Sequence, residues 1–375
     1  MNSALSIIAA FFIAVLMVPA LQAPARRLGL VDEPCKRKRH DGSIPLTGGL
    51  AMFIAIFGVF SVQPDLFLDQ YASLALGMGI LLVLGLIDDF IDLRAMFRLF
   101  VQILVASLAV VWAGLEVNVL GELLGPVVGP VGLGPFSTAF TVMSIVFLTN
   151  VINMADGVDG LAGGITLLFF VMLGMVAWLS GASASLMMVC FCLAAAAAGF
   201  LVWNMRFPFR AHASAFMGDA GSMMLGFAAA WLAIAVATDP EAAMAVYPIT
   251  IVWILLVPSM DTIAVALRRI SQGRSPMAPD RAHLHHILRR CGLSVTATVG
   301  LIHLSILATG MIGILAWLAE VPEWLLFAGA STLIVGYTIA LINAHHFLRW
   351  ALRRKRVPYK KPSLQRVNIK SRKNP

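Results

Sequence analysis

The chain has 375 residues and a formal net charge of +8; 60% of its residues are hydrophobic and 12% are charged. This composition, with a mean hydropathy of +0.89, excludes an ordinary water-soluble domain. Eleven apolar stretches are long enough to cross roughly 30 Å of hydrocarbon. In chain order they cover residues 3–22, 46–63, 70–87, 96–115, 136–153, 160–180, 183–203, 221–238, 244–266, 296–318 and 324–348.

The basic residues are distributed asymmetrically between the connections of these stretches. Alternate connections contain all Lys and Arg residues, at 26–39, 94–98, 206–210, 268–290 and from 349 onward. The positive-inside rule therefore predicts a periplasmic N-terminus and a cytoplasmic C-terminus. We expect an all-α polytopic membrane protein with about eleven transmembrane helices, in which a membrane domain over 1–348 precedes a basic cytoplasmic tail over 349–375. The tail suits an anionic lipid surface, and we expect no nucleic-acid binding.

Two acidic motifs lie at the predicted cytoplasmic ends of spans. The third span ends in Asp88 and Asp89, followed by Asp92, and carboxylates this close together suit either a hydrated helix end or a cation site. The fifth span ends in a polar residue at every third position, which would align side chains on one helical stripe. These residues are Asn150, Asn153, Asp156 and Asp159.

Two further polar motifs occur in later connections of the same side. Phe216-Met-Gly-Asp219 precedes the eighth span, where Asp219 suits either a helix cap or a ligand. Arg281, His283, His285 and His286 form the other motif, which suits a solvated face or an anion site. Each motif alone has a structural explanation, but four motifs in different connections of one side indicate a composite site at the cytoplasmic face.

Two buried-looking polar residues lie outside these motifs. Asp261, after Pro258 in the ninth span, is expected to pair with Arg268 or Arg269 or to serve the site. His303, within the tenth span, is interpreted as a buried hydrogen-bonding residue. Neither residue decides the functional class.

Carboxylate and amide oxygens without Cys and His zinc spacing favour Mg²⁺ or Mn²⁺, and such ions commonly bridge phosphates. The sequence has no Walker-type phosphate loop, which argues against an ATPase. A diphosphate donor and a lipid-embedded acceptor would together explain the acidic motifs and the large apolar content.

The four motifs, in this order over about residues 28–292, resemble those of the polyprenyl-phosphate N-acetylhexosamine-1-phosphate transferases, and specifically the bacterial N-acetylglucosamine branch. The basic loop at 36–40 and the following 44–49 segment match this family too, and are expected to help hold phosphate. The resemblance implies transfer of N-acetylglucosamine-1-phosphate from UDP-N-acetylglucosamine to undecaprenyl phosphate in the bacterial inner membrane. This reaction initiates O-antigen or related surface polysaccharides, and the family also suggests a homodimer.

By this resemblance, Asp219 holds the metal, with Asn153 as a second ligand. Asp88 orients or deprotonates the lipid phosphate, with Asp89 beside it, and Phe216 stacks on uracil. The remaining motif residues line the nucleotide, phosphate and sugar pocket: Asn150, Asp156, Asp159, Arg281, His283, His285 and His286.

Three alternatives remain open at this point. The muramoyl-pentapeptide transferases of peptidoglycan synthesis share the aspartate motifs, although the short histidine loop is closer to the N-acetylglucosamine branch. A donor with another UDP-N-acetylhexosamine would differ by one hydroxyl group. A secondary transporter, in which the acidic residues form a cation path, is less consistent with acidic residues at helix ends, because transporter sites usually lie near the membrane midplane.

Overall fold

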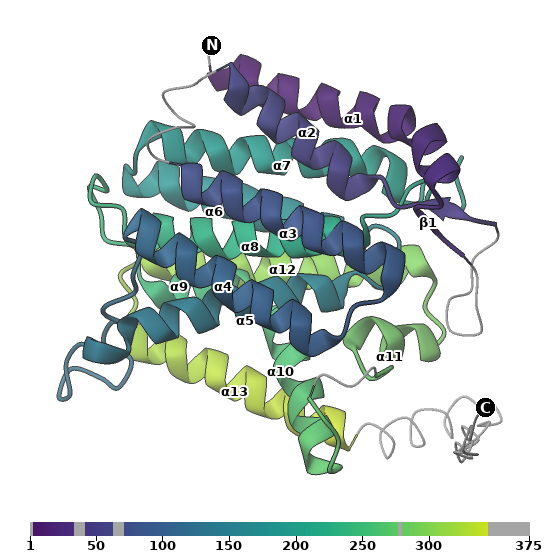
Figure 1. The fold of residues 1–375 in the computed structure, drawn as a ribbon. Helices are drawn as coiled ribbons and strands as arrows, with labels where there is room; N and C mark the ends of the chain where they lie inside the picture. The colour runs from purple at the N-terminus through teal and green to yellow at the C-terminus, as the bar shows by residue number, and fades with distance from the viewer. Residues whose placement is uncertain (1–2, 34–41, 63–70, 277–279, 344–375) are drawn as a thin grey trace, which may run out of the picture.

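The computed structural model describes residues 3–33, 42–62, 71–276 and 280–343. The basic loop at 36–40 and the predicted tail domain at 349–375 lie outside these residues. The described part is a bundle of helices that run mostly along one direction (Figure 1). One small antiparallel pair, β1 (Val31–Asp32) with β2 (Ile44–Pro45), is the departure from the predicted all-α architecture.

The helices, apart from the short α11, follow the predicted apolar stretches closely. In chain order the helices are α1 (Ser3–Leu28), α2 (Gly48–Ser61), α3 (Ala72–Ile91), α4 (Ala95–Ala113), α5 (Ser137–Ala155), α6 (Leu161–Ser180), α7 (Ala184–Asn204), α8 (Gly218–Ala237), α9 (Pro248–Ile254), α10 (Leu256–Ser271), α11 (Leu284–Arg290), α12 (Val295–Leu318) and α13 (Glu323–Ile342). Within the described residues, nine helices are long and apolar enough to cross a membrane, and α9 with α10 makes a tenth candidate. This confirms an all-α polytopic membrane protein.

Helix α8 forms the centre of the bundle. Almost all of its residues are buried, and α2, α3, α5 and α6 pack around it. Its Gly and Ala residues let neighbouring backbones approach closely, as is common between helices in membranes. A Cβ atom at Gly226 would lie 2.7 Å from the Cα atom of Thr149 on α5. The small residues of α8 therefore determine how closely the site-bearing helices pack.

The ninth predicted span is not one straight helix. Helices α9 and α10 meet at Leu255 with a bend of 80°. Pro258, in the first turn of α10, has no N–H to donate to the carbonyl of Ile254, and its ring crowds that carbonyl. The bend directs α10 away from the axis of α9, and α10 packs mainly against α13 (Figure 1).

The two ends of the bundle differ in charge. Every Lys and Arg that the structure describes lies at the end where α1, α3, α5, α7 and α10 finish. The opposite end carries acidic connections, which are joined by bonds such as Ser183 N to Asp239 Oδ2, at 2.9 Å. A hairpin at that end pairs Val119 with Gly132, as the glycine-rich stretch at 121–135 suggests. The separation predicted from the sequence is thus present in the fold.

Candidate active site

A carboxylate–arginine cluster joins three helices at the basic end of the bundle. Asp88, near the end of α3, forms an ion pair with Arg98 in the first turns of α4, and its Oδ1 accepts a bond of 2.6 Å from Leu93 N. The same Arg98 nitrogen lies 3.6 Å from Asp219 Oδ2 at the start of α8. The Asp88 side chain is 1% exposed and that of Asp219 is 37% exposed. Asp219 is therefore the carboxylate that is open to a ligand.

Asp89 holds the N-terminus of α8. Its two carboxylate oxygens accept bonds from Asp219 N at 2.9 Å and from Ala220 N at 3.3 Å. The first N–H groups of a helix have no partner within the helix, so this side chain serves as a cap supplied by another helix. Gly218 has a φ of +73°, and a Cβ atom there would lie 2.6 Å from Asp89 Oδ2. The glycine before Asp219 is thus required both by its backbone conformation and by this contact.

Helix α3 ends earlier than the acidic motif suggests. Its last residue is Ile91, and Asp92 has a left-handed φ of 51°. Asp92 therefore does not continue the helical face of Asp88, and its side chain lies at the exposed surface. The expectation of a shared face fails because the helix stops before it.

The asparagines of α5 both point into the site. Asn153 Nδ2 donates to Asp219 Oδ1 at 2.6 Å and to Ser222 Oγ at 3.0 Å. Asn150, one turn earlier, donates to Gln102 Oε1 on α4 at 2.6 Å. The predicted stripe therefore exists, but it ends at these two residues because α5 finishes at Ala155.

Asp156 and Asp159 lie in the turn after α5. Asp156 is the residue that ends the helix, and Asp159 Oδ2 accepts bonds from Arg206 Nε at 2.7 Å and from Ala213 N at 3.2 Å. Asp159 thus connects this turn to the connection between α7 and α8. The structure places it beside the Asp219 connection rather than against Asp219 itself.

Phe216 is held through its backbone. Its N–H donates to Pro45 O at 3.0 Å, and its carbonyl accepts from Gly48 N at 2.9 Å. Its side chain is half-buried, two residues before Gly218. The backbone at Phe216 thus joins the start of α2 to the connection that carries Asp219.

The histidine loop approaches the end of α5. The rings of His283 and His285 stack with 5.9 Å between their centroids, and those of His285 and His286 lie 4.2 Å apart. His285 Nε2 is buried without a hydrogen-bond partner, and a Cβ atom at Gly157 would lie 2.9 Å from it. This contact brings the second and fourth motifs together, whereas the neighbouring Arg281 is exposed at the surface.

Two of these histidines are neutral at physiological pH. Burial, followed by the neighbouring histidines, lowers the pKa of His285 to about 3. Burial and then the nearby His283, Arg290 and Arg281 lower the pKa of His286 to about 4. Both rings therefore act as neutral hydrogen-bonding groups.

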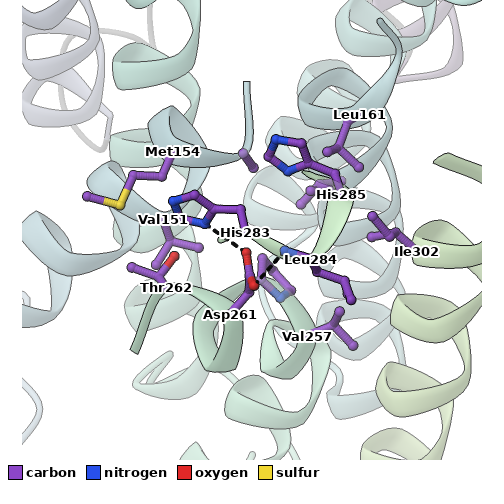
Figure 2. A pocket seen from close by; sticks show the side chains of 13 residues that line it. Val151, Met154, Leu161, Val257, Asp261, Thr262, His283, Leu284, His285 and Ile302 are labelled. Atoms are coloured by element: carbon purple, nitrogen blue, oxygen red, sulfur yellow. Dashed lines mark hydrogen bonds and ion pairs between the residues drawn. The ribbon is translucent and has the colours of Figure 1, made fainter. Parts of the chain in front are cut away.

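Asp261 does not pair with Arg268 or Arg269. Those arginines lie 3.0 and 3.6 Å from Asp280 Oδ2, which Arg274 approaches at 3.8 Å. Asp261 instead binds His283 and Leu284 (Figure 2). It also accepts a hydrogen bond from Tyr337. The expected pairing is wrong because Asp261 contacts α11 and α13, while Asp280 takes the arginines as partners. His303, as expected, is a half-buried residue whose Nε2 lies 3.2 Å from Leu161 O.

Two site residues lie outside all four sequence motifs. Arg98 and Gln102 occupy successive turns of α4, where Arg98 bridges two aspartates and Gln102 binds Asn150. Their signal in the sequence is a basic and an amide residue four positions apart, at the start of an apolar span. Such a pair lies on one helical face.

The donor atoms suit a hard cation such as Mg²⁺. Asp219 and Asn153 offer oxygen atoms, the ligand type that Mg²⁺ prefers. In the part of the chain that the structure describes, no three His, Cys, Asp or Glu side chains gather to hold an ion by themselves. A site with one or two protein ligands is the usual arrangement for Mg²⁺ that also binds substrate phosphates and water.

Comparison with known proteins identifies the family. Residues 71–237 match the family model described as glycosyl transferase family 4. The undecaprenyl-phosphate alpha-N-acetylglucosaminyl 1-phosphate transferase of Escherichia coli O157:H7 is 35% identical over 84% of this chain and 85% of its own length. The proteins of that name from Yersinia pestis and Haemophilus influenzae are 36% and 33% identical, and cover 84% and 94% of this chain and 85% and 98% of their own lengths. The chain therefore belongs to the family of the undecaprenyl-phosphate alpha-N-acetylglucosaminyl 1-phosphate transferases, as its motifs predicted.

Proposed function

We propose that the protein transfers N-acetylglucosamine-1-phosphate from UDP-N-acetylglucosamine to undecaprenyl phosphate, and so initiates a surface polysaccharide such as O-antigen. The observation that carries the proposal is the Asp88–Arg98–Asp219 cluster at the basic end of an apolar bundle. The names of its relatives supply the substrate class. A cationic group between two carboxylates, with Asp219 open to ligands, suits a phosphate site in a membrane protein.

The reaction exchanges one phosphoanhydride bond for another. An oxygen of the lipid phosphate attacks the phosphorus that carries the sugar, a new P–O bond forms, and UMP leaves with the electrons of the broken bond. The lipid phosphate is mostly dianionic at neutral pH and needs no strong base. The protein then has to position two anions and neutralise their charge.

Arg98 and Asp88 act as one unit in this proposal. Because Asp88 is bonded to Arg98 and to Leu93 N, it orients the guanidinium toward Asp219. Arg98, whose side chain is 26% exposed, contacts the lipid phosphate or the transferred phosphate. Asp88 then orients the lipid phosphate through Arg98. Asp89 supports Asp219 by holding the first turn of α8.

Mg²⁺ or Mn²⁺, bound through Asp219 and Asn153, would neutralise the diphosphate and orient its oxygens. Phe216 provides an aromatic face for uracil near this position, and Asn150, Asp156 and Asp159 shape the surrounding pocket. The neutral rings of His285 and His286 and the charged Arg281 face the diphosphate or the sugar. These assignments place the nucleotide between the α7–α8 connection and the histidine loop.

We further propose that this end of the bundle faces the cytoplasm of a bacterial inner membrane, with eleven crossings and a periplasmic N-terminus. The charge separation of the connections supports this orientation. Single cysteines placed near Glu122 and Glu241 should react with an impermeant reagent from outside, while one near Arg274 should not, in a background without Cys35 and Cys291. Labelling of the Arg274 position from outside would contradict the proposed site.

The direct test is donor profiling with purified protein, undecaprenyl phosphate, Mg²⁺ and a panel of UDP-sugars. We expect UMP release and a radiolabelled lipid diphosphate sugar with UDP-N-acetylglucosamine, and inhibition by added UMP. The panel should include other UDP-N-acetylhexosamines and UDP-N-acetylmuramoyl-pentapeptide. Turnover of the pentapeptide donor in place of UDP-N-acetylglucosamine would assign the protein to the peptidoglycan reaction instead.

A further inference from the structure

Asp261 is the centre of a hydrogen-bonded group that joins three helices. Its Oδ2 lies 2.9 Å from His283 Nδ1, and its Oδ1 accepts bonds from Leu284 N at 2.9 Å and from Tyr337 Oη at 2.6 Å. Asp261 belongs to α10, and His283 and Leu284 lie at the start of α11 (Figure 2). Tyr337 belongs to α13. Side chains of His283 and Asp261 are only 8% and 13% exposed. The group is therefore shielded from water and restricts how the histidine can turn.

These bonds select one form of the His283 ring. An ionised carboxylate can only accept hydrogen bonds, and Oδ1 is already occupied by two donors. The remaining oxygen therefore requires a proton on His283 Nδ1. In a neutral ring, Nε2 is then left as an acceptor, and a second proton on Nε2 would make it a donor opposite the negative charge of Asp261.

The second nitrogen of His283 is directed toward the proposed site. Among the described residues, Nε2 has no hydrogen-bond partner. Figure 2 shows this nitrogen turned away from Asp261, toward Met154 at the end of α5. Met154 follows Asn153, which binds Asp219. The ring of His283 thus lies between Asp261 and the helix end that carries the proposed metal and phosphate residues.

We infer that Asp261, held by Tyr337, is a positioning residue that presents His283 Nε2 to the polar atoms of the nucleotide-sugar donor. The inference rests on the proposed function, because it concerns how that donor is held. It also gives α13 a role in the site, although this helix lies outside the 71–237 segment that matches the family model. A histidine oriented by a carboxylate loses little freedom when it binds a ligand, because its geometry exists before the ligand arrives.

The alternative is that these bonds only fasten α10 to α11 and α13. The two explanations make opposite predictions for amide replacements of His283. The amide nitrogen of Asn can take the place of the donating Nδ1, whereas the amide oxygen of Gln can take the place of the accepting Nε2. If Nε2 binds the donor, His283→Gln should keep kcat within about tenfold of wild type, and His283→Asn should lower kcat by about a hundredfold. If the Nδ1–Asp261 bond only holds α11 against α10, His283→Asn should retain activity and His283→Gln should lose it.

Variants of the two supporting residues test the positioning itself. In Asp261→Asn, Oδ1 can still accept from Leu284 N and Tyr337, but the amide N–H faces Nδ1 and moves the ring proton to Nε2. We expect the kcat of Asp261→Asn to fall about ten- to a hundredfold, with an unchanged melting temperature in detergent. The kcat of Tyr337→Phe should fall less. Asp239→Asn is the matched control, because both carboxylate oxygens of Asp239 also accept hydrogen bonds, from Ser183 N and Glu241 N, but Asp239 lies at the opposite end. Normal kcat in Asp261→Asn would overturn the inference.

The ring form can be measured without turnover. In protein labelled with ¹⁵N-histidine, the resonances that disappear in His283→Gln belong to His283. We expect a protonated Nδ1 in wild type and a shift of the proton to Nε2 in Asp261→Asn. A proton on Nε2 alone in wild type would overturn the inference even if the enzyme is active. Conversely, the expected spectra in a protein that uses no UDP-sugar would count against the proposed function and leave the Asp261–His283 arrangement standing.

Discussion

Replacing Arg98 should destabilise the protein because buried Asp88 loses its partner. It should also stop the reaction because the proposed phosphate contact is lost. Arg98→Met keeps much of the apolar stem but leaves Asp88, whose side chain is 1% exposed, without its cationic partner. Loss of one member of a buried ion pair typically costs about 3 to 5 kcal/mol, because the other charge stays in a medium of low dielectric constant. Since the Arg98 side chain is 26% exposed, we expect the lower limit, about 3 kcal/mol.

The measurement is reversible unfolding in mixed detergent, with Asp88→Asn and the double variant Arg98→Met/Asp88→Asn completing a double-mutant cycle. The double variant should recover most of the stability, because no buried charge remains, but not the activity. Arg268→Met is the matched control, since Asp280 keeps Arg269 and Arg274 nearby and should lose little. A decrease of less than about 1 kcal/mol in the unfolding free energy of Arg98→Met would refute the conclusion that Asp88 and Arg98 form a buried ion pair.

Further predictions concern the proposed metal ligand Asp219, the proposed uracil-stacking residue Phe216 and the histidine loop. Asp219→Asn should abolish Mg²⁺-dependent turnover without changing the melting temperature; near-normal activity would remove it from the metal site. Phe216→Ala should mainly raise the KM for the donor, because a base contact acts equally in the ground and transition states; an unchanged KM would contradict stacking. Gly157→Ala should lower kcat by displacing His285, whose Nε2 lies 2.9 Å from the added Cβ atom, and wild-type kcat would argue against this contact. Because the pKa of His285 falls from 6.5 to about 3 on folding, the unfolded protein takes up a proton there that the folded protein does not as the pH falls below 6.5. The free energy of unfolding should therefore be highest above pH 6.5 and should fall by about 1.4 kcal/mol per pH unit as the pH decreases toward 3. Equal slopes for wild type and His285→Gln would contradict this.

The helices were predictable because their length and apolar composition are direct requirements of a membrane span. The bend between α9 and α10 was not predicted, since an apolar run looks the same whether it is straight or bent. Pro258 was the local cue, and a proline alone does not specify the direction of the following helix. The short α11 was missed for a similar reason, because seven residues contain too few turns to show a period.

The site was predictable where its residues form dense polar motifs, and obscure where single residues contribute. Arg98 was counted only as evidence of topology, because nothing in the sequence places it between Asp88 and Asp219. Asp261 was assigned to nearby arginines, whereas its partner Tyr337 lies 76 residues further along the chain. Contacts of this kind depend on how helices pack, and one sequence does not contain that information.

The backbone contacts around the first turn of α8 limit how this enzyme can change over evolution. Gly49 on α2 and Gly85 on α3 lie directly against the backbone of Ala220 and Gly221, with no side chain between them. A larger residue at either glycine has no rotamer that relieves the overlap, so whole helices would have to move, and Asp219 would move with them. We therefore expect substitutions that change the proposed donor contacts to be tolerated in the histidine loop and the α7–α8 connection rather than at these glycines. A saturation library should show this contrast as almost no tolerated substitutions at Gly49 and Gly85, and many at exposed positions of those two connections.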